Sequence, residues 1–335
     1  MPDLSVESSK VPSKVTVLSG GVGGARFIRG LLHLIRTSGA DTAVSVVTNT
    51  ADDWWIHGLK VCPDLDTVMY TLGNGIDQER GWGRVDESWQ CKEELAAYGV
   101  EPTWFGLGDR DLATHLVRTQ MLDAGYSLTD VTAALCTRWN PGVTLLPMTD
   151  DRVETHVVIT DPADGEQKAV HFQEYWVRHR ANVPAHGLAV IGLAESRATD
   201  QVVEAISGAD LVIVPPSNPI VSVGTIVGVP GVREALESTA APVVGVSGIV
   251  GGDHVHGMAR QLLTLHDIEV SAAGVAEHYG ARPHGLLDAW LVDERDAGLV
   301  SRIESAGITC QARPLMMTDL DATAAIARAA IELVS

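Results

Sequence analysis

Residues 14–24 read Lys14-Val15-Thr16-Val17-Leu18-Ser19-Gly20-Gly21-Val22-Gly23-Gly24. A short apolar run typical of a β-strand ends here in a cluster of glycines. The next apolar side chains recur at helical spacing: Phe27, Ile28, Leu31, Leu32 and Ile35. A second apolar run, 43–47, follows this helix. The stretch therefore predicts a βαβ unit whose first turn is built from glycine.

The candidate phosphate contacts in this turn are Gly20, Gly21, Gly23 and Gly24. Glycine lets a phosphate approach backbone N–H groups, and the helix N-terminus adds partial positive charge. The dinucleotide fingerprint requires a third glycine at position 26, which is Arg26, and no Gly-Lys-Ser/Thr of a P-loop is present. The turn matches neither standard type, so a nucleotide or diphosphate ligand and a plain tight turn both stay open.

Composition limits the classes of function. The chain has 335 residues, of which 45% are hydrophobic and 20% charged, which is typical of one large globular α/β domain or two. A net charge of −19 disfavours nucleic acid as a partner. The four cysteines contain no Cys-x-x-Cys, which favours a reducing cytoplasm over a zinc site or disulfides. No apolar run approaches the roughly 20 residues that span a bilayer, so we expect no membrane segment.

Strand character predicts the architecture. Short continuous runs such as 211–214 and 243–246 are typical of strands buried on both faces. We therefore expect an α/β fold with a doubly wound, mostly parallel, Rossmann-like sheet built from residues 14–60 and 187–335. Residues 61–186 are interpreted as a mixed helical and strand insertion that forms part of the acceptor site, and residues 1–13 as a disordered tail. Within the insertion, the alternating segment 171–177 predicts a strand with one wet face.

Loops after the predicted strands are rich in small polar residues. Ligands of open parallel sheets bind beyond the carboxyl ends of the strands. The candidates for phosphate or nucleotide contact at these ends are Asn49, Thr50, Ser217, Asn218 and Gly251. Each loop taken alone is more typical of a plain turn than of a binding loop, whereas their joint position at one sheet edge favours a phosphate-bearing ligand.

Four acids lie near the same edge: Asp52, Asp53, Asp64 and Asp66. Clustered carboxylates repel, so a buried group of them holds a cation or shares a proton. Mg²⁺ is the natural candidate because it binds one or two carboxylates together with substrate phosphate oxygens. We assign Asp53 and Asp66 as the functional and metal-binding pair. The competing interpretation is that two of the four acids are solvated helix caps.

Histidines offer weaker signals. His171 and Gln173 lie on one face of a predicted strand and either contact a heteroaromatic ligand or form a half-buried polar face. For His254 and His256, in a glycine-rich loop, phosphate contact or exposure is favoured over metal ligation. Residues 109–111 are interpreted as a structural ion-pair turn.

Eight motifs in order resemble those of the 2-phospho-L-lactate transferase family of coenzyme F420 biosynthesis, whose mycobacterial-type members are phosphoenolpyruvate transferases. They are Ser19–Gly24, Asn49–Asp53, Pro63–Thr67, Gly106–Asp111, Leu146–Asp151, His171–Gln173, Pro216–Pro219 and Gly274–Glu277. The resemblance covers nearly the whole chain after Lys14. One departure is the loop 247–251, which reads Ser-Gly-Ile-Val-Gly where the family often has Ser-Pro-Ile-Ile-Gly.

The resemblance implies a reaction and its partners. A guanosine diphosphate donor would pass its enolpyruvyl- or lactyl-bearing phosphate to the terminal hydroxyl of the deazaflavin Fo, with release of GMP and a requirement for Mg²⁺. In this scheme Asp53 and Asp66 would be catalytic, and Asp64, His171 and Gln173 would bind the acceptor. The resemblance also suggests a homodimer. The rival hypotheses are an NAD(P)-dependent oxidoreductase, which Arg26 disfavours, and a non-catalytic nucleotide-binding module, which the acid cluster disfavours.

Overall fold

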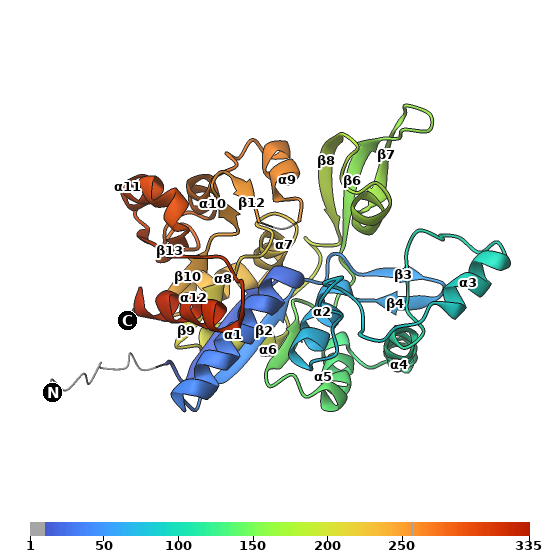
Figure 1. The fold of residues 1–335 in the computed structure, drawn as a ribbon, viewed down its shortest axis with the longest axis horizontal. Helices are drawn as coiled ribbons and strands as arrows, with labels where there is room; N and C mark the ends of the chain where they lie inside the picture. The colour runs from blue at the N-terminus through green and yellow to red at the C-terminus, as the bar shows by residue number, and fades with distance from the viewer. Residues whose placement is uncertain (1–10, 256) are drawn as a thin grey trace.

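The computed structural model describes residues 11–255 and 257–335, and its centre is a seven-stranded sheet in which every neighbouring pair is parallel (Figure 1). The strand order is β14-β13-β10-β9-β1-β2-β5. The strands are β1 (Lys14–Ser19), β2 (Ala43–Thr48), β5 (Thr144–Pro147), β9 (Leu211–Val214), β10 (Val243–Val246), β13 (Ala289–Val292) and β14 (Thr309–Ala312). The predicted doubly wound, Rossmann-like α/β fold is confirmed.

Strand β1 lies inside the sheet between β9 and β2, and this position explains why its residues are apolar on both faces. Val15 is paired with Val44 of β2 on one side and with Leu211 of β9 on the other. Val17 packs into the apolar cluster on one face of the sheet, whereas Leu18 packs into the cluster on the other. A strand buried on both faces needs no polar alternation.

Helices cover both faces of the sheet. One face carries α1 (Val22–Ser38), α2 (Pro63–Leu72), α5 (Leu128–Trp139) and α12 (Leu320–Glu332). Figure 1 shows α1 and α12 side by side, and the two helices are in contact. The other face carries α6 (Asp200–Ser207), α7 (Val223–Gly228), α8 (Val232–Ser238), α9 (Ala259–Leu265), α10 (Ala272–Tyr279) and α11 (Val300–Ser305), the last preceded by the 3₁₀-helix η2 (Glu294–Leu299).

Smaller elements extend beyond the carboxyl ends of the central strands. They are the hairpin β3 (Trp54–Ile56) and β4 (Leu59–Val61), the helices α3 (Gln90–Ala97) and α4 (Asp111–Asp123), and the short hairpin β11 (Ile249–Val250) and β12 (Asp253–His254). A three-stranded antiparallel sheet adds β6 (Glu154–Thr160), β7 (Gln167–His171) and β8 (Ala185–Ile191). Within the described ranges, no helix is both long and apolar enough to cross a bilayer.

The predicted strand over residues 171–177 is wrong. Strand β7 ends at His171, and Glu174–Arg178 form a π-helical turn, η1. The backbone N–H of Gln173 donates to His171 Nδ1 at 3.1 Å instead of continuing the ladder. Phe172 and Tyr175 are both buried at a helical spacing of three residues, so the aromatic pattern serves a turn.

The structure also bears on the expected boundaries. Strand β5 comes from within residues 61–186, and it nevertheless joins the central sheet beside β2. Residues 1–10 of the expected tail lie outside the described residues. Val11 is buried, and the Pro12 carbonyl accepts a hydrogen bond from Thr42 Oγ1 at 2.8 Å, so the packed chain begins before residue 14. The helix expected from about residue 255 begins at Ala259.

Candidate functional site

Two cavities meet beyond the carboxyl ends of β1, β2, β9 and β10. The glycine-turn cavity, about 350 Å³, is lined by Gly21 and Gly23 together with residues 215–219 and 246–249. The aromatic cavity, about 400 Å³, lies between α2, the loop 80–83, residues 105–107 and η1. Residues that line both cavities are Gly21, Val22, Asp52, Asp64, Phe172 and Trp176. The arrangement is one site with two lobes and a shared wall that contains two carboxylates.

The glycine turn is shaped by close approach of other backbone and side chains. A Cβ on Gly21 would lie 2.6 Å from Asp64 Oδ1, and one on Gly23 would lie 2.3 Å from the Pro216 carbonyl oxygen. Glycine therefore allows the N-terminus of α1 to meet both the acid pair and the loop after β9. The Gly20 N–H donates to Ser217 Oγ at 3.1 Å and fixes that loop to the turn.

Asn49 joins the two carboxylates of the shared wall. Its side-chain Nδ2 donates to Asp52 Oδ2 at 3.1 Å and to Asp64 Oδ2 at 3.0 Å. Its Oδ1 accepts from the Ala51 N–H and from Thr225 Oγ1, so the amide orientation is fixed. Asn49 thus positions the acids, and neither Asn49 nor Thr50 lines a cavity.

Asp52 and Asp64 have no cationic partner among the described residues. Burial, reinforced by Asp64 and Asp53, raises the pKa of Asp52 well above its usual range. Burial, with a contribution from Asp53, raises the pKa of Asp64 to about 7. The Oδ1 atom of Asp52 is buried and has no hydrogen-bond partner in the described chain. A cation at this wall would relieve both the repulsion and the missing partner.

Asp53 and Asp66, the acids that the sequence favoured, lie beside these two but face cations of the protein. The Lys60 ammonium lies 3.3 Å from Asp53 Oδ2, although burial still raises the pKa of Asp53. Arg118 is fully buried and binds both oxygens of Asp66 in a bidentate pair, one contact being 3.1 Å. The metal assignment to Asp53 and Asp66 stays a prediction. Both carboxylate oxygens of Asp53 lack a hydrogen-bond partner in the described chain, but only Asp52 and Asp64 line both cavities, which favours these two for that role.

A buried chain of polar groups continues from Arg118 along the wall of the aromatic cavity. Arg118 Nη1 lies 3.1 Å from His115 Nδ1, and His115 Nε2 lies 3.2 Å from Asp111 Oδ2. The Tyr70 hydroxyl donates to Asp111 Oδ1 at 2.6 Å. Hydrogen bonds and His115 keep the pKa of Asp111 below its usual value despite burial. These contacts join α2 and α4, although His115 Nε2 and Arg118 Nε are buried without a hydrogen-bond partner in the described chain.

The aromatic cavity suits a flat ring. Its aromatic lining residues are Tyr70, Trp82, Phe105, Phe172 and Trp176. Gln173 also lines it, and its side-chain Nε2 donates to the Asp52 carbonyl at 3.3 Å. His171 does not line it: the ring stacks on Trp54 at 5.4 Å, and its Nε2 lies 3.2 Å from the Asp53 carbonyl. Burial lowers the pKa of His171 to about 4, so this imidazole is neutral near pH 7.

Other candidates divide between the cavity and the scaffold. Ser217 and Asn218 line the glycine-turn cavity, and Asn218 Oδ1 also accepts from the Ile220 and Val221 N–H groups. Gly20, Gly24 and Gly251 do not line either cavity, and the Gly251 N–H donates to Asp296. His254 lines the glycine-turn cavity beside Asp253, whereas His256 lies outside the described residues.

Residues 109–111, interpreted as a structural turn, have two roles. Asp109 accepts from Ser88 Oγ and from the N–H groups of Gln90 and Cys91, so its role is structural, but it is held by hydrogen bonds and not by the expected ion pair. Asp111 instead lines the aromatic cavity. Sequence reasoning also missed Lys60, His115 and Arg118. The only signal for them was the need of clustered acids for nearby cations.

A metal site here would be completed by a ligand. No group of three or more His, Cys, Asp or Glu residues in the described ranges is arranged to hold a metal ion. Two carboxylates, one with an orphaned buried oxygen, fit Mg²⁺, which typically binds one or two carboxylates and completes its shell with water and phosphate. The donor set at Asp52 and Asp64 therefore fits that ion.

The chain is similar to known proteins over nearly its whole length. Residues 15–329 match the family model described as 2-phospho-L-lactate transferase CofD. A Streptomyces griseus protein named phosphoenolpyruvate transferase is 60% identical over 320 residues, covering 96% of this chain and 98% of that protein. A Mycobacterium avium protein of the same name is 55% identical, with the same shares covered. A solved Bacillus halodurans structure, a member of the UPF0052 family, has a TM-score of 0.61 at 15% identity, covering 96% of this chain and 99% of that one; it shows likeness of fold.

Proposed function

Because the chain belongs to the CofD 2-phospho-L-lactate transferase family, we propose that it transfers a phosphoenolpyruvyl group from a guanosine diphosphate donor to the terminal hydroxyl of the deazaflavin Fo, releasing GMP in coenzyme F420 biosynthesis. The relatives named phosphoenolpyruvate transferase, at 55–60% identity over 96% of the chain, favour the enolpyruvyl group over the lactyl group. Membership of this family makes the chain a phospho-group transferase.

The observation that carries the proposal is the acid pair shared by two lobes. Asp52 and Asp64 line both cavities, so they stand where a molecule in one lobe would meet a molecule in the other. Transfer between a phosphate-bearing donor and a ring-bearing acceptor requires this juxtaposition. A site for one ligand alone would not need two lobes with different chemistry.

The glycine-turn cavity fits the donor. The N-terminus of α1, a helix of 17 residues, and the small residues Ser217 and Gly248 can approach a diphosphate closely. Mg²⁺, when bound by Asp52 and Asp64, would neutralise charge on the donor's phosphate oxygens. The aromatic cavity fits the acceptor, since Trp82 and Trp176 offer faces for a deazaflavin ring.

In the proposed reaction the acceptor hydroxyl oxygen attacks the phosphorus that bears the enolpyruvyl group. The bond from that phosphorus to the oxygen bridging to GMP breaks, and GMP leaves with the bridging oxygen. Asp64 is the candidate to take the hydroxyl proton, because it lines both lobes and so borders the aromatic cavity in which the acceptor would lie. Asn49 holds this carboxylate next to Asp52. In phosphoryl transfer, correct positioning of the reacting groups supplies much of the rate acceleration.

The test is incubation of the chain with Fo, the enolpyruvyl guanosine diphosphate donor and Mg²⁺, with mass detection of the phosphodiester product and GMP. Product formation that is lost with a metal chelator and restored by Mg²⁺ supports the proposal. Parallel reactions with the lactyl donor decide whether the transferred group carries enolpyruvate or lactate. If neither donor gives product, the assignment is refuted. A homodimer is also expected, to be checked by sedimentation velocity.

A further inference from the structure

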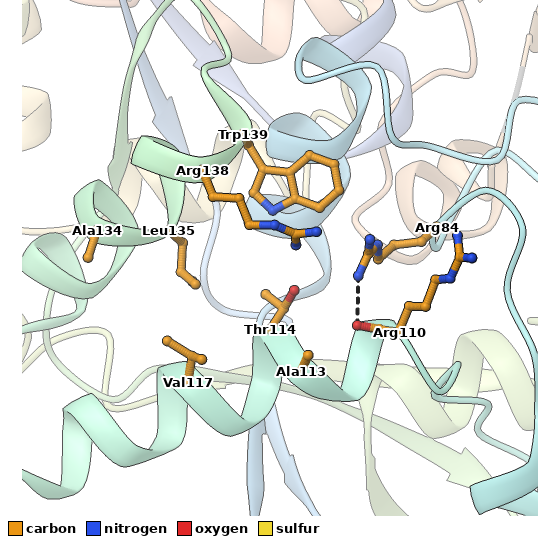
Figure 2. Close-up of a pocket in the computed structure, with 9 residues that line it drawn as sticks. All are labelled: Arg84, Arg110, Ala113, Thr114, Val117, Ala134, Leu135, Arg138 and Trp139. Atoms are coloured by element: carbon orange, nitrogen blue, oxygen red, sulfur yellow. Dashed lines mark hydrogen bonds between the residues drawn. The ribbon is translucent and has the colours of Figure 1, made fainter.

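A third cavity lies outside the two-lobed site. It has a volume of about 670 Å³ and lies between α4, α5 and residue 84, as Figure 2 shows. We call it the arginine groove. Its lining residues are Arg84, Arg110, Ala113, Thr114, Val117, Ala134, Leu135, Arg138 and Trp139. None of them lines the glycine-turn or aromatic cavity.

The charge of the groove is opposite to that of the chain. Three arginines and no acid line it, although the chain carries 43 acidic residues against 24 lysines and arginines. Within the described residues, Arg84, Arg110 and Arg138 form no ion pair within 4 Å. A local cluster of uncompensated cations on an acidic protein favours an anion as occupant.

Two of these arginines flank one indole ring. The guanidinium carbon of Arg84 lies 5.0 Å from the Trp139 ring centroid, and that of Arg138 lies 4.8 Å from it. In Figure 2 both side chains reach toward the space beside this ring, from different elements. Two like charges at one ring repel, and an anion between them would replace repulsion by charge-assisted hydrogen bonds.

The groove is held in shape without a ligand. Arg84 Nη1 donates to the Arg110 carbonyl at 2.7 Å, while its Nε is buried without a hydrogen-bond partner in the described chain. The Trp139 ring lies against glycine backbone, since a Cβ on Gly75 would lie within 2.1 Å of it. The Tyr70 ring packs against the same indole at 4.7 Å. An orphaned donor and a fixed ring are features of a prepared binding site.

The floor of the groove is apolar. Val117 is 43% exposed, and Leu135 lies opposite it in Figure 2; Ala113 and Ala134 also line the groove. A purely inorganic ion would leave this surface bare. An occupant with an apolar or ring portion would cover it while its anionic group meets the arginines.

We propose that the arginine groove binds a small organic anion, with a phosphate or carboxylate group between Arg84 and Arg138 and an apolar or ring portion over Val117 and Leu135. This site is separate from the proposed donor and acceptor lobes. It does not depend on the identity of the reaction.

The experiment uses the full chain labelled with 5-fluorotryptophan. The sequence has eight tryptophans, and Trp139→Phe assigns the ¹⁹F resonance of Trp139. Phenyl phosphate, benzoate and inorganic phosphate are the probes, so the series separates phosphate from carboxylate and tests the need for a ring. We expect a saturable shift of the Trp139 resonance, with tighter binding of a ring-bearing anion than of inorganic phosphate.

The variant Arg84→Gln/Arg138→Gln should weaken this binding by roughly tenfold or more, the scale of a lost charge-assisted hydrogen bond. The matched control Arg36→Gln/Arg313→Gln removes two exposed arginines elsewhere and should leave the affinity unchanged. The seven other tryptophan resonances show that each variant is folded.

Three results would overturn the proposal. The first is no response of the Trp139 resonance to any probe. The second is equal affinity in the wild type and in Arg84→Gln/Arg138→Gln. The third is a Trp139 shift that follows protein concentration without added anion, together with self-association in sedimentation velocity, which would make the groove an interface between copies.

Discussion

Asp52 and Asp64 accept hydrogen bonds from the same nitrogen, the Nδ2 of Asn49, and line both lobes of the site. One amide donor cannot neutralise two buried carboxylates. The shared wall is therefore an electrostatically unfavourable arrangement in the free protein. The repulsion between these two buried carboxylates is the reason to expect a cation or a proton there.

Asp64→Asn should reduce turnover by roughly a hundredfold or more, because it removes the candidate base and one proposed metal ligand. Affinity for the guanosine nucleotide without metal should change little. Asp123→Asn, an exposed acid at the end of α4, is the control and should behave as wild type. Steady-state kinetics and calorimetric titration measure the two effects. Equal losses of turnover and nucleotide affinity would contradict the assigned role.

Stability without metal should fall as pH rises toward neutrality. The pKa of Asp64 is about 7 in the folded chain against a usual value of 3.8, so the unfolded state loses this proton first. The stabilising contribution is full below the usual pKa and is lost as pH rises through about 7. Thermal unfolding of the wild type, compared with Asp64→Asn across this range, measures the difference. If the gap in Tm between them does not change with pH, the raised pKa is refuted.

Arg118→Met should destabilise the fold strongly, by about 3–5 kcal/mol, because it leaves Asp66 buried without its partner. The double variant Arg118→Met/Asp66→Leu should recover much of this loss, since both charges are then absent. Denaturant unfolding measures both free energies. A double variant as unstable as the single one would show that Asp66 stabilises the fold through contacts other than this ion pair.

Trp82→Ala should raise the KM for the deazaflavin acceptor and leave the KM for the donor nearly unchanged. Its indole is 47% exposed and lines the aromatic cavity but not the glycine-turn cavity, so the loss of ring contact acts on bound acceptor. Tyr98→Ala, which removes an 83% exposed ring at the end of α3, is the control. If the donor KM rises more than the acceptor KM, the aromatic cavity binds the donor and the assignment of the two cavities is wrong.

Gly23→Ala should weaken donor binding and lower Tm, because the new methyl group would lie 2.3 Å from the Pro216 carbonyl oxygen and must displace that loop. Gly298→Ala is the matched control, since a Cβ there meets no atom within 4 Å. Thermal shift with and without GDP measures both effects. A normal Tm and a normal GDP response in Gly23→Ala would contradict the proposed role of the turn.

The sheet could be predicted because its signals are local. Continuous apolar runs such as 211–214 specify strands buried on both faces, and the glycine turn specifies the first βα connection. The turn η1 could not be predicted in the same way. The alternation at 171–177 is compatible with a strand, and only the tertiary contacts of Phe172 and Tyr175 decide for a helical turn.

The sequence predicted which residues lie near one another in the site, but not which side chains pair with which. The sequence placed four acids at one edge, and the structure brings all four together. The sequence could not show that Lys60 faces Asp53 or that Arg118 faces Asp66. Arg118 lies 52 residues from Asp66 along the chain. Long-range pairing depends on how α4 packs on α2, which no local pattern encodes.

The interior position of β1 in the sheet also has a consequence for the order of assembly. Its neighbours are β2, which follows within the first 48 residues, and β9, which ends at residue 214 of 335. During synthesis, β1 and β2 emerge from the ribosome long before β9 can close the other side of the sheet. We expect the nascent chain to expose the unpaired backbone edge of β1 throughout that interval, and chaperone dependence to end only once β9 has been translated.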